Sequence, residues 1–145
     1  MFIYLALAAV LLAICVAIHA IVLTAVYRWA VRSPLLQTSR FWPLTWLLIQ
    51  VAWWTLLAHL VEIVVWAGFY TWQEVFADLD TAFYFSLVTY TTVGYGDVVA
   101  SEHWRHFAAL EGLVGILMCG WSTGFLFAIV NQMYLSIKAK TSSRS

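Results

Sequence analysis

The chain has 145 residues, of which 64% are hydrophobic and only 10% are charged, and its mean hydropathy is +0.89. Soluble domains carry about 25% charged residues, so the composition excludes an ordinary water-soluble domain. Seven basic and seven acidic residues cancel to a formal net charge of +0, which argues against a nucleic-acid partner. Cys15 and Cys119 lie within apolar runs and are expected to be small buried residues; no Cys/His spacing resembles a zinc site. We therefore expect a small integral membrane protein in the lipid bilayer.

Three apolar runs are long enough to cross a bilayer, which takes about 20 helical residues. They cover residues 2–27, 43–69 and 107–137. Residues 72–90 are too polar at their start and too short to span. They are typical of a re-entrant half-helix, a form tolerated only where protein or a water-filled cavity surrounds it. The predicted fold is therefore an all-α membrane protein with three transmembrane helices and one re-entrant helix, which starts near Asp78 or Asp80.

The charged residues predict the orientation. The basic residues that follow the first and third runs are Arg28, Arg32, Arg40, Lys138, Lys140 and Arg144. The acidic residues of the segment between the second and third runs are Glu74, Asp78, Asp80, Asp97 and Glu102. Basic loops stay in the cytoplasm, so we expect the N-terminus outside and the C-terminus in the cytoplasm. The small size suggests a bacterial inner membrane.

The most informative stretch is residues 91–97, with the sequence TTVGYGD. A cation that loses its water needs a cage of oxygens, and the backbone offers one carbonyl per residue. Thr92, Val93, Gly94 and Tyr95 would supply these carbonyls, and the Thr92 hydroxyl would add one more oxygen. Turning successive carbonyls toward one axis requires left-handed backbone angles, which Gly94 and Gly96 accept. The side chains of Val93 and Tyr95 would then point into the surrounding protein.

This stretch matches the TVGYG selectivity filter of potassium channels. Residues 43–137 resemble the pore domain of tetrameric potassium channels, in particular small bacterial channels without a voltage sensor. The resemblance implies K+ as the permeant ion and a homotetramer, since each chain carries one filter stretch. It also implies that Gly96 and Asp97 support the filter. Residues 1–42 would add an extra transmembrane helix with a basic loop, and residues 138–145 a short cytoplasmic tail.

The sequence departs from this family beside the filter. Val88 occupies a position where the simplest bacterial channels place a glutamate that pairs with the aspartate. Asp97 therefore needs another partner. Tyr84 and Phe85 stand where paired tryptophans are common, so the indole donors of those tryptophans are missing.

Two carboxylates interrupt the apolar runs. Charged groups in a bilayer are costly and are functional candidates by default. Glu62 and Glu111 could tune gating by hydrogen bonds behind the filter, for instance to Ser86 or Thr89. Alternatively they are structural acids, with His59 available to Glu62 one turn away.

Other polar and small residues within the runs have two interpretations as well. His19 is expected to be a neutral residue of helix packing. Gly115 and Gly120 could serve as gating hinges, and each could equally serve close helix packing.

The predicted function is passive, potassium-selective conduction, without an enzymatic step. A regulatory or structural membrane subunit and a less selective cation channel are the alternatives. The intact Gly94, Gly96 and Thr92 argue against a decayed filter. No run carries arginine at every third position, and no run holds a catalytic set or a metal cluster. The gating stimulus and any regulatory partner stay open.

Overall fold

The computed structural model describes residues 2–36, 38 and 40–142 of the chain. The elements in chain order are α1 (Phe2–Arg32), α2 (Phe41–Trp72), α3 (Leu79–Tyr90), the 3-10 turn η1 (Glu102–Trp104) and α4 (Arg105–Ser142). Within these residues there is no strand, so the predicted all-α fold is confirmed. Arg144, which entered the orientation argument, lies outside the described residues.

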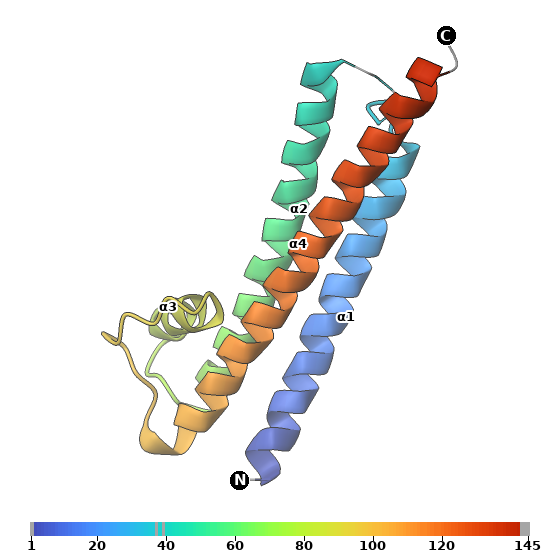
Figure 1. Ribbon diagram of the computed structural model, residues 1–145. Helices are drawn as coiled ribbons and strands as arrows, with labels where there is room; N and C mark the ends of the chain where they lie inside the picture. The colour runs from blue at the N-terminus through green and yellow to red at the C-terminus, as the bar shows by residue number, and fades with distance from the viewer. Residues whose placement is uncertain (1, 37, 39, 143–145) are drawn as a thin grey trace.

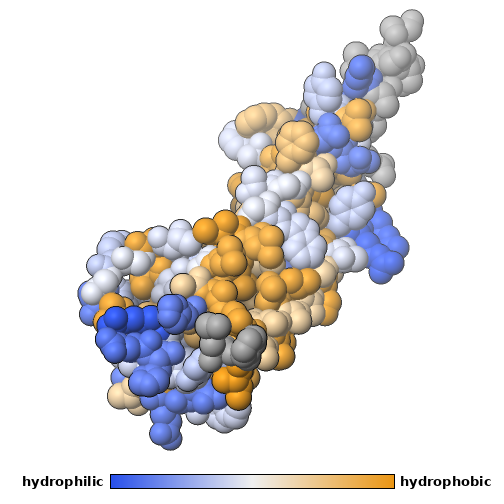
Figure 2. Space-filling view, turned by 60° about the horizontal axis from the view of Figure 1, so that its bottom comes forward, coloured by the Kyte–Doolittle hydropathy of each residue, from blue (hydrophilic) through white to orange (hydrophobic). Residues whose placement is uncertain are grey.

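Three long helices lie side by side, and the short α3 packs across one end of them (Figure 1). The stretches Ile3–Arg32, Phe41–Trp72 and Glu102–Lys138 are each long and apolar enough to cross a membrane. The two chain ends lie at opposite ends of the bundle (Figure 1), as three crossings require. Apolar side chains form a band across the middle of the face in Figure 2, with more polar surface toward both ends.

The helices are longer than the apolar runs predicted. α2 starts at Phe41, so Pro43 lies within its first turn, where backbone N–H groups have no partner inside the helix and proline costs little. α3 is shorter than the predicted 72–90 segment, because the chain turns between Trp72 and Leu79. Asp78 caps α3: its Oδ1 accepts a hydrogen bond from the Thr81 N–H at 2.8 Å. The predicted start near Asp78 is confirmed.

Two clusters of buried side chains hold the bundle together. The cluster near α3 is aromatic, with Trp66, Tyr70 and Phe107 fully buried. The cluster at the other end is aliphatic and includes Leu47 and Ile129. α1 contributes to both clusters. In the part of the chain that is described, α1 packs along α2 and α4, whereas α3 packs on α2 and α4 away from α1.

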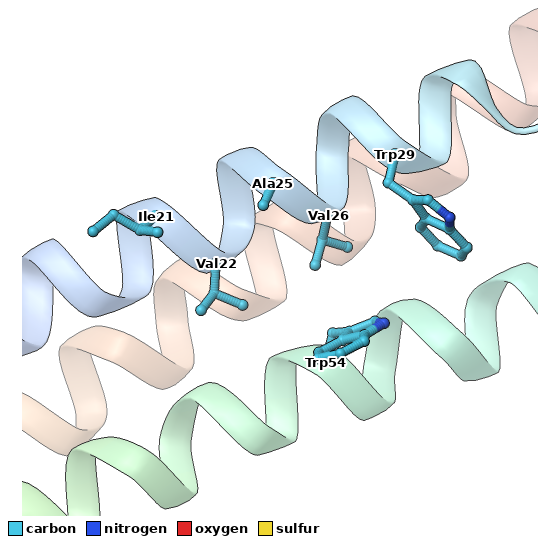
Figure 3. A pocket seen from close by; sticks show the side chains of 6 residues that line it. All are labelled: Ile21, Val22, Ala25, Val26, Trp29 and Trp54. Carbon is cyan, nitrogen blue, oxygen red and sulfur yellow. The ribbon is translucent and has the colours of Figure 1, made fainter.

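An apolar groove of about 340 Å³ lies between α1 and α2. Its lining comes mainly from α1, with Trp29 facing Trp54 of α2 (Figure 3). None of its lining side chains carries a charge, so it offers no ligands for an ion.

Gly115 marks the closest approach between α4 and the end of α3. A Cβ atom added there would lie 1.9 Å from the Tyr90 carbonyl oxygen, whereas one added at Gly120 or Gly124 would meet nothing within 4 Å of this chain. Gly115 is therefore needed for packing inside the chain. The close packing considered for Gly120 does not occur within the single chain.

We predict that Gly115→Ala destabilises the protein by about 1–3 kcal/mol, because the obstructing atom belongs to the backbone and one helix must move. Gly68→Ala is the matched control, since a Cβ at Gly68 on α2 meets nothing within 4 Å. Thermal unfolding of both variants in the same detergent checks this. Equal melting temperatures would contradict the close approach.

Candidate functional site

The loop of residues 92–97 follows α3 directly and folds back over its end. The N–H of Thr92 donates to the Thr89 carbonyl at 3.0 Å, and the N–H of Gly94 donates to the Val88 carbonyl at 3.0 Å. Val88, which stands where related channels place a glutamate, contacts this loop through its backbone carbonyl. Its side chain is buried and lines a hollow of about 320 Å³ behind the loop.

The backbone of the loop alternates in handedness. Thr92, Gly94 and Gly96 have φ of 61°, 52° and 78°, and Val93 and Tyr95 between them do not have positive φ. The left-handed angles expected at the two glycines are confirmed. The positive φ of Thr92 was not expected, because a β-branched residue rarely adopts it. The sign of φ therefore alternates along the loop, so its backbone is neither a helix nor a regular strand.

The loop is open on the single chain. Every residue from 91 to 97 is exposed, and the side chains expected to point into surrounding protein, Val93 and Tyr95, are 51% and 73% exposed. The rest of the chain does not cover them. A single chain therefore leaves the loop without enclosure.

Asp97, at the end of the loop, has a hydrogen-bond partner that could not be identified from the sequence. The Tyr84 hydroxyl donates to Asp97 Oδ2 at 2.6 Å, and the Val98 N–H donates to Oδ1 at 3.1 Å. Tyr84 thus replaces the donors that the missing tryptophans would have supplied. Its hydrogen bond favours the carboxylate and lowers the pKa of Asp97 below its usual value.

The Glu111 side chain links the three helices α2, α3 and α4. Its Oε2 accepts a hydrogen bond from the Tyr70 hydroxyl at 2.8 Å, and its Oε1 is paired with the Ser86 hydroxyl. Ser86 also lies 3.2 Å from the Ile63 carbonyl. The expected contact between an intramembrane carboxylate and Ser86 is confirmed for Glu111; Thr89 is not its partner in the described contacts. The contact ties α2, α3 and α4 together.

Glu62 belongs to a second network that closes into a ring. Its Oε1 lies 2.7 Å from His19 Nδ1, and its Oε2 accepts a hydrogen bond from the Tyr90 hydroxyl. The Tyr90 oxygen lies 3.0 Å from His59 Nδ1. Ser122 Oγ lies 2.9 Å from the Nε2 atoms of both His19 and His59 and completes the circle. The five residues come from α1, α2, α3 and α4.

Ser122 has one hydroxyl proton and can donate to only one of the two imidazoles. The other imidazole must then donate to Ser122 through its own Nε2–H.

His19 is thus more than the packing residue that was expected. No single apolar run holds a metal cluster, but the structure brings together two of the runs, and one potential ligand atom from each of His19, His59 and Glu62 lies within 4.8 Å of the others. Their separation in sequence concealed the cluster; the available signal was a polar side chain near the middle of each apolar run. Cys15 is buried as expected, whereas Cys119 is exposed on this chain.

The fold defines an all-α integral membrane protein with a short helix and an exposed backbone loop beside its three long helices. The comparison with protein families agrees: the model described as "Ion channel" matches residues 56–132, more than half of the chain. The protein belongs to this ion channel family. No curated protein and no solved structure gave a significant match.

We predict that Tyr84→Phe raises the pKa of Asp97 toward its ordinary value, because the donor that favours the carboxylate is lost. A lowered pKa in the folded state means that this contact stabilises the loop above the unfolded-state pKa of Asp97. The stabilisation fades as the pH falls through the folded-state value. Infrared spectroscopy of the protein with isotope-labelled aspartate, during acid titration, measures the shift. An unchanged Asp97 titration in Tyr84→Phe would contradict the contact.

For Glu111 we predict a contrast between two substitutions. Glu111→Gln keeps one acceptor for Tyr70 and one donor for Ser86, so its loss of stability is small. Glu111→Leu leaves the buried Tyr70 hydroxyl unpaired, whereas Ser86 can still donate to the Ile63 carbonyl, so the variant loses about 1–3 kcal/mol. Thermal unfolding of both variants in detergent distinguishes them, and a Gln variant as unstable as the Leu variant would contradict the pairing.

Proposed function

We propose that the chain forms a potassium-selective channel, in which four identical subunits conduct K+ passively through a pore lined by their 92–97 loops. The observation that carries the proposal is the alternation of positive φ at Thr92, Gly94 and Gly96 within a TVGYG sequence. The carbonyls of Thr92, Val93, Gly94 and Tyr95, together with the Thr92 hydroxyl, would coordinate K+ in place of water.

The exposure of the loop supports assembly. One chain offers a single open wall, and an ion cage requires several copies around one axis. Neighbouring subunits would then cover Val93 and Tyr95. Because α3 and α1 pack on α2 and α4 without touching each other, α3 would face the pore axis and α1 would lie at the periphery of the tetramer. The C-terminal end of α3 would direct the negative end of its dipole toward a central cavity and favour a cation there.

The placement of charge supports the proposed orientation. Arg28 and Arg32 at the end of α1, Arg40 before α2 and Lys138 near the end of α4 lie at one end of the bundle, whereas the loop and its acidic residues lie at the other. Under the positive-inside rule the basic end is cytoplasmic. The N-terminus and the loop would then be outside, in the inner membrane of a bacterium.

The test is ion flux from liposomes that contain the purified protein. We expect potassium flux that greatly exceeds sodium flux and is blocked by barium. The particle mass after subtraction of the detergent should be four times the 16.5 kDa chain mass. Equal flux of both ions would favour the less selective channel, and absence of flux across pH and voltage would favour the regulatory subunit.

The variant Gly94→Ala tests the loop itself. A Cβ at Gly94 meets nothing within 4 Å, but its φ of +52° is one that alanine adopts only with strain. We expect Gly94→Ala to fold and assemble as the original does and to lose potassium selectivity. Gly68→Ala is the matched control, because Gly68 lies on α2 and not in the loop. We expect this control variant to conduct normally. Unchanged selectivity in Gly94→Ala would contradict the role of the loop.

A further inference from the structure

We propose that His19, His59 and Glu62 form a binding site for a transition-metal dication, Zn²⁺ above all, at the place where α1 joins the pore domain. The site does not depend on ion conduction, and its ligands are distinct from the residues of the 92–97 loop. Two imidazoles and one carboxylate are a ligand set that zinc accepts, with a fourth position left for water. Mg²⁺ and Ca²⁺ prefer oxygen ligands throughout and would bind poorly.

The distances are close to those of a zinc site. Ligand atoms around tetrahedral zinc, at bonds of about 2.0–2.2 Å, lie about 3.4 Å apart. Here Glu62 Oε1 lies 2.7 Å from His19 Nδ1, and Glu62 Oε2 lies 3.8 Å from His59 Nδ1. One ligand atom from each of the three residues lies within 4.8 Å of the others, so shifts of up to about 1.5 Å would bring these atoms around a metal ion. His19 and Glu62 are fully buried, whereas His59 keeps 14% of its side chain exposed and offers a route of entry.

The surroundings provide what metal-bound histidines require. A histidine that binds a metal through one ring nitrogen normally donates its other ring N–H to a fixed acceptor. Ser122 Oγ lies 2.9 Å from Nε2 of both histidines, and a hydroxyl oxygen can accept two hydrogen bonds. With both Nε2 atoms protonated, both Nδ1 atoms are free to bind the metal. The Ser122 proton would then turn to a helix carbonyl one turn back, as the Thr123 hydroxyl does with the Cys119 carbonyl.

The experiment is calorimetric titration of the chelator-treated, assembled protein in detergent, with Zn²⁺ and with Mg²⁺. We expect one zinc ion per chain and no response to Mg²⁺. His19→Gln and Glu62→Gln should lose this stoichiometric binding, and Ser122→Ala should weaken it about 10–100-fold. His103→Gln/His106→Gln is the matched control, because both histidines are exposed and lie outside the ring.

The proposal is overturned if His19→Gln and Glu62→Gln bind zinc as the original protein does, or if only the His103→Gln/His106→Gln control loses it. If the ring variants fail to fold, measurements on the unmodified protein still test the proposal. A zinc stoichiometry well below one ion per chain, or a Mg²⁺ response equal to that of zinc, would refute the site. Cobalt offers a second measurement: strong visible absorption by the Co²⁺-loaded protein indicates four-coordinate geometry, and weak absorption contradicts it.

Discussion

The constraint on which the rest of this structure depends is that a polar side chain inside a bilayer has no water to bind. Four such side chains, His19, Glu62, Ser86 and Glu111, are fully buried here, and each has a partner on another helix. If one of these side chains had no partner, the protein would lose free energy of folding equal to a substantial part of the stability of a small domain. The helices can therefore pack only in an arrangement that pairs these groups.

Both networks converge on α3, which is too short to be held by apolar contact alone. Ser86 ties the middle of this helix to Glu111, and Tyr90 ties its last turn to Glu62. Gly115 lets α4 approach the Tyr90 carbonyl, and the carbonyls of Val88 and Thr89 receive the first N–H groups of the loop. The position of the loop thus follows from two buried carboxylates and one glycine. The Glu62 ring also attaches α1, so the additional helix is linked by hydrogen bonds to the end of α3.

The outer end of the loop is held in a different way. With valine at position 88, no carboxylate lies behind Asp97 to share a proton with it, and the side chain that contacts Asp97 is a phenol. A phenol–carboxylate hydrogen bond keeps Asp97 ionised, because the donor stabilises the charged form. A carboxyl–carboxylate pair would instead hold one proton between two acids. The loop of this protein is therefore braced by a hydrogen bond that weakens only under acidic conditions.

The sequence by itself determined the number of crossings and the presence of a half-helix, because length and hydropathy act locally along a helix. It also determined the left-handed angles at Gly94 and Gly96, since few other residues accept them. Tertiary structure alone decided which polar groups meet. Tyr84 pairs with Asp97 across 13 positions, and His19 meets Ser122 across 103, and no local pattern encodes such pairings. The missed cluster of His19, His59 and Glu62 has the same cause: a ring built from four helices exists only once the helices pack, and the need to satisfy each buried polar group then selects its members.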